Sequence, residues 1–142
     1  EDTGGDFDVI VAGVGTSGTI TGIASVLRTY NEDLYVAGVE PASSAVLSGE
    51  AKGPHKIQGI GAGFIPPLYD VKLVDEIIKV TNEDAIDMAK TVAQTDGVSI
   101  GISAGAAVFA AVELAKKKMF VNKKIVVILP DSAERYLSTG VF

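Results

Sequence analysis

The feature that most constrains the fold is a glycine-rich loop that directly follows a short run of β-branched residues. Residues 8–12 read DVIVA, as expected of a buried parallel strand. The stretch AGVGTSGTITG, residues 12–22, then matches the pattern G-x-G-x-x-G and opens an apolar helical stripe that ends near residue 30. A strand, a glycine loop and a helix in this order place unpaired N–H groups and the positive end of a helix dipole around one small volume. The sequence therefore predicts an anion site at this loop.

The remainder of the chain alternates strands and helices. Strands are predicted at residues 34–39, 77–80, 98–100 and 124–129, and helices at 44–49 (short), 81–95 and 105–118. Thr81 and Asp84 form a capping pattern at the start of the second of these helices, and Gly97 is a stop signal at its end. Alternation of this kind predicts an α/β fold of three layers, with a mostly parallel, twisted sheet and helices on both faces. We expect one α/β domain over residues 1–142, with a right-handed crossover in its first βαβ unit.

Composition excludes several classes of function. The net charge of −6 disfavours nucleic acid as a partner. With no cysteine and one histidine, the chain has no disulfide, no thiolate nucleophile and no expected metal site. The apolar run at residues 100–112 is too short for a membrane span, and residues 1–6 do not resemble a signal peptide, so we expect a soluble protein.

Hydroxyl groups in the first glycine loop favour one compact phosphate as the anion. Thr16, Ser17 and Thr19 flank Gly18 and could join the backbone N–H groups around a phosphate monoester. A dinucleotide is the alternative, because Glu40 ends the next predicted strand where a ribose-binding carboxylate belongs. Glu40 as a solvated carboxylate at the rim of the sheet is an equally good interpretation, and a tight turn without a ligand also stays open.

Two other loops carry candidate residues. Ser103, in GISAGAA, either projects its hydroxyl toward the same crevice or caps the helix that follows. The middle loop either brings its backbone close to a flat ligand and closes as a lid, or is an ordinary surface loop; its residues are Gln58, Gly59, Ile60, Gly61, Ala62 and Gly63. His55 is interpreted as a structural loop residue, and Lys116, Lys117 and Lys118 as the solvated end of a helix.

Four motifs in this order resemble the cysteine synthase family, also called O-acetylserine sulfhydrylases, which are pyridoxal-phosphate enzymes of fold type II. They are VAGVGTSGTITG, HKIQGIGAGFIP, GISAGAA and KIVVILPDSAERYLST, and the likeness runs in register from about Phe7 to Phe142. Cystathionine β-synthases are the nearest rivals, but KIQGIGAGF is more similar to the cysteine synthase version.

The resemblance implies a role for each matching residue. It implies that the Ser103 hydroxyl meets the pyridine nitrogen of pyridoxal 5′-phosphate and that residues 58–63 line the substrate side. It implies a cup around the cofactor phosphate formed by Gly15, Thr16, Ser17, Gly18 and Thr19. Ser17 stands where the family more often has glycine. This replacement keeps the backbone N–H, but it requires a backbone conformation that serine can adopt. A neutral serine at the ring nitrogen suits β-replacement, in which acetate leaves O-acetylserine and sulfide adds to give L-cysteine.

The resemblance also implies that something is missing from this stretch. The family's Schiff-base lysine and its Thr/Ser-Gly-Asn substrate loop belong to an N-terminal segment, and none of the ten lysines here occupies the matching motif. We therefore expect a C-terminal, large-domain part of a longer chain that is inactive alone. The resemblance further implies a homodimer with a small amino-acid substrate, and we expect a cytoplasmic location, with an organelle as the alternative. A cystathionine β-synthase-like fragment, an NAD-binding oxidoreductase domain and a non-catalytic binding module stay open.

Overall fold

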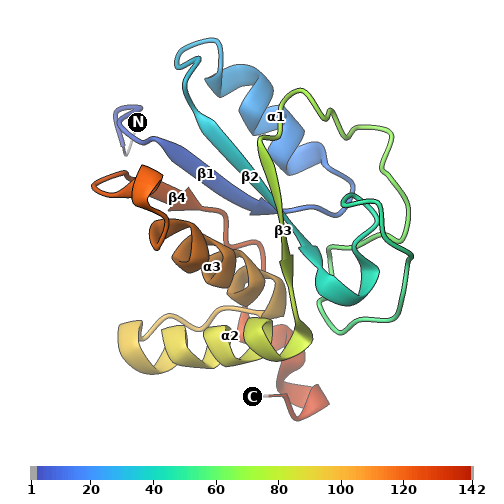
Figure 1. The fold of residues 1–142 in the computed structure, drawn as a ribbon. Coiled ribbons are helices and arrows are strands. Elements are labelled where there is room, and N and C mark those ends of the chain that lie inside the picture. The colour runs from blue at the N-terminus through green and yellow to red at the C-terminus, as the bar shows by residue number, and fades with distance from the viewer. Residues whose placement is uncertain (1–2, 142) are drawn as a thin grey trace.

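A parallel β-sheet forms the centre of the computed structural model, which describes residues 3–141 (Figure 1). All pairs of neighbouring strands in this sheet are parallel, and the strand order is β3-β2-β1-β4. The strands are β1 (Val9–Gly13), β2 (Tyr35–Pro41), β3 (Glu76–Val80) and β4 (Ile125–Val127). Because the first glycine loop follows β1 and β1 lies inside the sheet, that loop emerges at the centre of the sheet's carboxyl edge.

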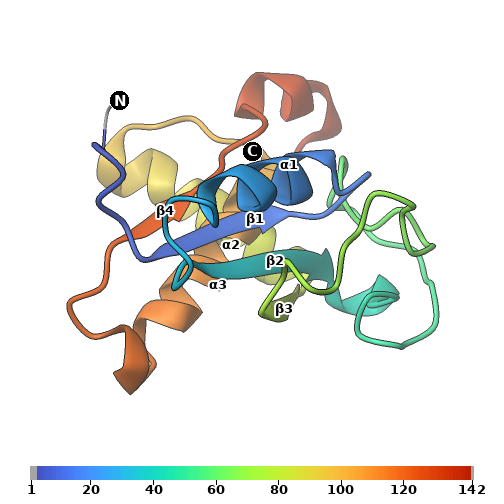
Figure 2. The ribbon, with the colours of Figure 1, turned by 90° about the horizontal axis from the view of Figure 1, so that it is seen from above.

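Helices cover both faces of the sheet, which confirms the predicted three-layer α/β fold (Figures 1 and 2). The α-helices are α1 (Gly18–Leu27), α2 (Asn82–Asp96) and α3 (Ile102–Ala115). In Figure 1, α1 lies on one side of the strands, whereas α3 and then α2 lie on the other. Short 3₁₀ turns complete the regular structure at η1 (Ala42–Ser44), η2 (Lys118–Phe120) and η3 (Ala133–Thr139).

The pleat of β1 divides the core between the two faces. Val9 and Val11 pack in a cluster with the buried residues of α3, whereas Ile10 and Ala12 pack with Ile20 and the rest of the buried face of α1. Successive side chains of a strand point to opposite faces of the sheet. A strand whose two faces are both covered by helices therefore needs apolar residues at every position. The run VIVA therefore explains why β1 is an interior strand.

Close packing of α2 on α3 depends on one glycine. A Cβ at Gly105 would lie 2.2 Å from the Ala85 carbonyl oxygen and 2.9 Å from the Ala89 Cβ. Gly105 therefore serves helix packing and lies inside α3. The expected caps of α2 are confirmed, since the Thr81 hydroxyl accepts the Asp84 N–H at 3.1 Å and Gly97 ends the helix with φ 70°.

Two predicted elements were wrong, and the bounds of a third are shifted. Residues 98–100 form no strand; only Ile100 makes an isolated antiparallel bridge, with Ser132. The short helix expected at 44–49 is absent: Ser44 ends the 3₁₀ turn η1, and residues 46–49 form turns, because the Glu40 carboxylate accepts the N–H groups of Leu47 and Ser48 at 2.9 and 3.0 Å. The helix expected at 105–118 spans Ile102–Ala115, since the glycine taken for its turn is a packing position.

Two kinds of feature are absent from residues 3–141. No helix there is long and apolar enough to cross a bilayer. Within the same range, no three histidine or acidic side chains gather in a way that could hold a metal ion.

Candidate functional site

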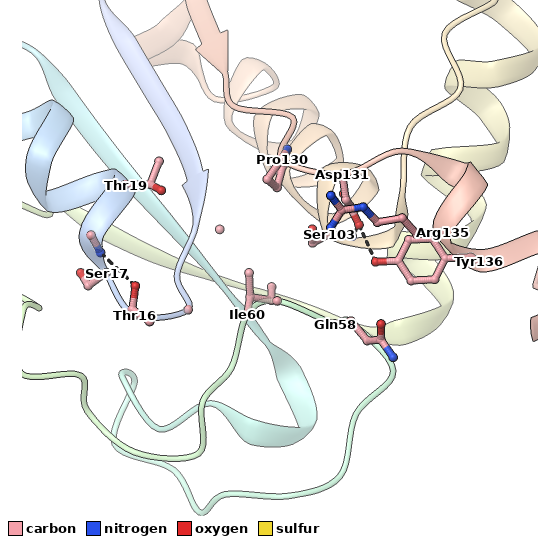
Figure 3. A pocket seen from close by; sticks show the side chains of 14 residues that line it. Thr16, Ser17, Thr19, Gln58, Ile60, Ser103, Pro130, Asp131, Arg135 and Tyr136 are labelled. Carbon is pink, nitrogen blue, oxygen red and sulfur yellow. Dashed lines mark hydrogen bonds between the residues drawn. The ribbon is translucent and has the colours of Figure 1, made fainter.

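A cavity of about 350 Å³ opens at the carboxyl edge of the sheet, where the first glycine loop, the middle loop and the N-terminus of α3 meet (Figure 3). Its size falls within the range of roughly 300–1,000 Å³ that is usual for small-molecule sites. The lining residues are Gly13, Gly15, Thr16, Ser17, Gly18, Thr19, Gln58, Gly59, Ile60, Ser103, Pro130, Asp131, Arg135 and Tyr136. Figure 3 shows Thr16, Ser17 and Thr19 on one side and Ser103, Asp131, Arg135 and Tyr136 on the opposite side. A ligand with two different ends could therefore contact both sides.

Free backbone donors gather on the first side. Within residues 3–141, the N–H groups of Gly15, Thr16 and Ser17 form no hydrogen bond. The first helical bond of α1 runs from the Thr21 N–H to the Ser17 carbonyl at 3.0 Å, so the Thr19 N–H also precedes the helical ladder, while the Gly18 N–H donates to Thr16 Oγ1 at 3.5 Å. No acidic residue lies in the first turn of α1. These donors and the helix dipole together suit an anion with several acceptor oxygens.

Ser17 adopts the left-handed conformation, with φ 70°, as the N-cap of α1. Its hydroxyl lies 2.9 Å from the Thr21 hydroxyl, which itself donates to the Leu68 carbonyl at 2.9 Å. Because the single Thr21 proton is used on Leu68, Ser17 is the donor in the bond to Thr21. The Ser17 proton is therefore held by α1, and the backbone N–H is the donor that Ser17 presents to the cavity.

The middle loop packs directly on the first glycine loop. The Gly61 N–H donates to the Val14 carbonyl at 3.0 Å, and a Cβ at Gly15 would lie 2.3 Å from the Gly59 carbonyl oxygen. Only the first half of the loop reaches the main cavity: Gln58, Gly59 and Ile60 line it. Gly61, Ala62 and Gly63 line a separate cavity of about 10 Å³.

His55 holds this loop in place. Its Nε2 lies 3.0 Å from the Gly61 carbonyl oxygen, which agrees with the structural role expected from the sequence.

Ser103 lies in the first turn of α3, on the opposite side of the cavity. Its side chain is 3% exposed, and its hydroxyl has no hydrogen-bond partner in the part of the chain that the structure describes. The N-cap of α3 is Gly101, which has no side-chain cap of its own. The interpretation of Ser103 as a helix cap was therefore wrong, and its hydroxyl remains available to a ligand.

Four lining residues were missed in the sequence: Pro130, Asp131, Arg135 and Tyr136. Pro130 and Asp131 follow β4, and the carboxyl ends of parallel strands share one edge, so the position of β4 was the signal that could have found them. Among the lining residues, Asp131 is the one carboxylate and Arg135 the one cation. Burial and the hydrogen bond to Asp131 raise the pKa of Tyr136 above its ordinary value of 10.0, so this hydroxyl stays protonated and donates.

Both interpretations of Glu40 were wrong. The residue is 2% exposed, so it is not solvated, and it accepts hydrogen bonds from the Leu47 N–H and from the N–H and hydroxyl of Ser48. Its two oxygens are thus bound to its own loop, and Glu40 does not line the main cavity. The carboxylate that the dinucleotide interpretation requires for a ribose is therefore absent from the site.

One of the lysines after α3, Lys117, forms an ion pair with the sheet that the sequence did not suggest. Lys117 pairs with Glu76 of β3 at 2.6 Å, although it was expected to be a solvated helix end. Burial opposes ionisation of Glu76, but hydrogen bonds from Lys117 and Tyr35 outweigh it and lower the pKa of this carboxyl below 4.5. The pair joins the end of α3 to the sheet, far in sequence from Ser103.

Comparison with known proteins identifies the class. The family of pyridoxal-phosphate dependent enzymes matches residues 1–131, and the chain belongs to this family. The chain is 53% identical to cysteine synthase A of Escherichia coli strain K12, over 100% of its own length and 46% of that protein. It is 50% identical to cysteine synthase B of Campylobacter jejuni, over 99% of this chain and 46% of that protein.

Solved structures agree with the sequence relatives. O-acetyl serine sulfhydrylase isoform 3 of Entamoeba histolytica superposes with a TM-score of 0.98 at 49% identity, covering 99% of this chain and 42% of that one. The O-acetylserine dependent cystathionine beta-synthase of Helicobacter pylori gives a TM-score of 0.92 at 34% identity, covering 99% of this chain and 45% of that one. The chain thus spans about half the length of the relatives it matches.

The residues present fit the family's cofactor. Its phosphate needs several donors in a small volume, and the unpaired N–H groups of residues 15–17 provide them at the dipole end of α1. Its pyridine nitrogen needs one polar partner at the other end, and the unpartnered hydroxyl of Ser103 is such a group.

Proposed function

We propose that the protein containing this chain is a cysteine synthase, which replaces the acetate of O-acetylserine by sulfide to give L-cysteine. Two observations support the proposal: about half of all positions are identical to named cysteine synthases, and free donors and a free hydroxyl face one cavity from opposite sides. Within this proposal, residues 1–142 are the C-terminal, large-domain half of a fold type II enzyme. The coverage of 46% of the relatives' length supports a partial chain.

The chain's own residues bind and orient the cofactor in this proposal. The N–H groups of residues 15–19 hold the phosphate, aided by the hydroxyls of Thr16 and Thr19, and Gln58, Gly59 and Ile60 cover the cavity and exclude water. Pyridoxal phosphate, when bound, supplies the electron sink that β-replacement on an amino acid requires. Ser103 holds one hydrogen bond at the ring nitrogen, and as a neutral group it does not strongly favour a protonated ring.

The rest of the reaction depends on groups outside this chain. We propose that the lysine that binds the cofactor covalently and the loop that grips the substrate carboxylate lie in the remaining part of the protein. The 142-residue chain alone is then inactive, and no cysteine should form when it is supplied with pyridoxal phosphate, O-acetylserine and sulfide. Measurable turnover by this chain would overturn that part of the proposal.

The assembled enzyme is proposed to be a cytoplasmic homodimer that acts on a small amino acid and binds neither nucleic acid nor membranes. The net charge of −6 supports the exclusion of nucleic acid.

The experiment measures cofactor binding and cysteine formation in the full-length protein that contains this segment. We expect visible absorbance from bound pyridoxal phosphate and formation of cysteine that depends on O-acetylserine and sulfide. Ser103→Ala should weaken cofactor binding about fivefold, the effect of one hydrogen bond worth about 1 kcal/mol. Ser25→Ala is the matched control, because Ser25 is exposed on α1 and its hydroxyl bonds only to the Gly22 carbonyl.

The same assay separates the alternatives. Cystathionine formed with homocysteine, and no cysteine with sulfide, would favour the cystathionine β-synthase class. Tight NAD binding with no uptake of pyridoxal phosphate would refute the proposal, and so would a full-length protein that binds neither.

A further inference from the structure

The N-terminus of α3 is capped by a residue from a distant part of the chain. Asp131 Oδ1 accepts the Ala104 N–H at 2.8 Å, and Asp131 Oδ2 accepts the Ser103 N–H at 3.2 Å. A carboxylate that accepts first-turn N–H groups stabilises a helix and offsets the positive end of its dipole. Asp131 therefore does for α3 what an N-cap side chain would ordinarily do, from 27 positions away.

The surroundings of Asp131 are built for this contact. A Cβ at Gly101 would lie 2.3 Å from the Asp131 carboxyl carbon, so a larger residue would displace the carboxylate from the helix. The Gly101 N–H also donates to the Asp131 carbonyl at 2.9 Å. On its other side, the buried Tyr136 hydroxyl donates to Asp131 Oδ2 at 2.6 Å (Figure 3). Backbone and side chain of Asp131 are thus both held against α3.

The helix turn that Asp131 holds is the one that carries Ser103. The Ser103 backbone N–H is bound to Asp131, whereas its hydroxyl has no partner in the described chain and lines the cavity. Loss of the carboxylate would leave two buried N–H groups unsatisfied, and the first turn would be free to fray or rotate. The direction of the Ser103 hydroxyl therefore depends on Asp131.

We propose that Asp131, held by Tyr136, is a positioning residue that fixes the Ser103 hydroxyl at the cofactor's ring nitrogen. The inference rests on the proposed function, since it assigns a support to a contact that the proposed cofactor makes. Asp131 acts through Ser103 and makes no contact of its own with the ring. Arg135 is the one cation that lines this cavity, and it has no ion-pair partner among residues 3–141. The Asp131 carboxylate therefore binds the N-terminus of α3 and does not pair with Arg135.

A double-mutant cycle on cofactor affinity in the full-length protein tests the proposal. Asp131→Asn keeps the shape but replaces one accepting oxygen by a donor, and we expect pyridoxal phosphate to bind more weakly by up to about fivefold, the full effect of losing the Ser103 contact. Ser103→Ala should weaken binding about fivefold, and the double variant should bind no more weakly than Ser103→Ala alone. The visible absorbance of the bound cofactor should shift in the same direction in all three variants.

Controls separate positioning from general damage to the fold. Asp87→Asn, an exposed position on α2 whose carboxylate forms no hydrogen bond within residues 3–141, should leave affinity and absorbance unchanged. Tyr136→Phe removes one hydroxyl and should give a weaker effect in the same direction; it replaces Asp131→Asn in the cycle if that variant does not fold. Single-variant losses that multiply in the double variant, or an unshifted absorbance, would show a merely structural role and refute the positioning role.

The outcomes also distinguish the two proposals. A wild-type protein that does not bind pyridoxal phosphate overturns the proposed function. Binding by the wild type together with multiplying losses overturns the role of Asp131 alone.

Discussion

Alanine at Gly105 should destabilise the protein although alanine is the better helix former. The new Cβ would lie 2.2 Å from the Ala85 carbonyl oxygen, whereas ordinary contacts begin at 3.4 Å, so α2 and α3 must separate by about 1 Å. The obstacle is backbone of α2, which cannot turn aside as a flexible side chain can. The strain must therefore be relieved by moving a whole helix.

The expected magnitude follows from two opposing effects. Overpacking of a core costs about 1–3 kcal/mol, and a clash with backbone belongs at the upper end of that range. The gain in helix propensity from glycine to alanine is about 1 kcal/mol. The net loss is about 2 kcal/mol, which corresponds to a fall in Tm of roughly 3 °C for a protein of about 300 residues.

Thermal and urea unfolding of the full-length protein check this prediction, with Gly22→Ala as the matched control. Gly22 lies inside α1, and nothing lies within 4 Å of the position that a Cβ would take there, so alanine should stabilise by up to about 1 kcal/mol. Cofactor affinity should also fall in Gly105→Ala, because α3 carries Ser103. If Gly105→Ala unfolds at or above the wild-type temperature, the argument from helix packing is wrong.

Two further predictions concern single side chains. Ser17→Ala should lower the free energy of unfolding by about 1 kcal/mol through loss of the bond to Thr21. Ser17→Gly should be nearly neutral, because relief of the left-handed conformation, about 1 kcal/mol, offsets that loss; urea unfolding in which the glycine variant is the less stable of the two would contradict this. Glu76 has a lowered pKa in the folded state, so its pairing stabilises the protein above pH 4.5 and is lost as the pH falls through the folded pKa. Glu76→Gln should therefore lower stability by about 0.5–1 kcal/mol at pH 7, and the gap to the wild type should close as the pH falls through the folded pKa; a gap that does not narrow towards acid in a pH series of unfolding curves would exclude this linkage.

Local patterns predicted most of the fold. The run at Val9 and the turn signals at Thr81 and Gly97 depend on neighbours in sequence, and the structure confirms the elements they indicated. The predictions of helix position failed where a side chain outside the segment binds its backbone N–H groups. Glu40 draws two N–H groups out of a helix that its neighbours favour, and Asp131 caps a helix that begins 29 positions before it.

The residues of the candidate site that lie in local sequence motifs could be predicted, whereas those brought there by strand pairing could not. Thr16 and Ser103 lie in motifs that the chain displays locally, and both line the cavity. Arg135 and Tyr136 lie in the motif KIVVILPDSAERYLST, but they reach the cavity because β4 lies beside β1 in the sheet, and the motif alone does not indicate that pairing. The replacement of the commoner glycine by Ser17 drew attention to the backbone at this position, but the sequence did not predict the left-handed conformation, since serine rarely adopts it.

The capping of α3 by Asp131 has a consequence for the order in which the protein is made. Ser17 leaves the ribosome more than a hundred residues before Asp131, which at about 5–20 residues per second is a delay of roughly 6–23 s. During that interval the phosphate side of the cavity can form, while the first turn of α3 still lacks its carboxylate. The side of the cavity formed by residues 15–19 can therefore form first, whereas the side that carries Ser103 is completed only after β4 and Asp131 have been added.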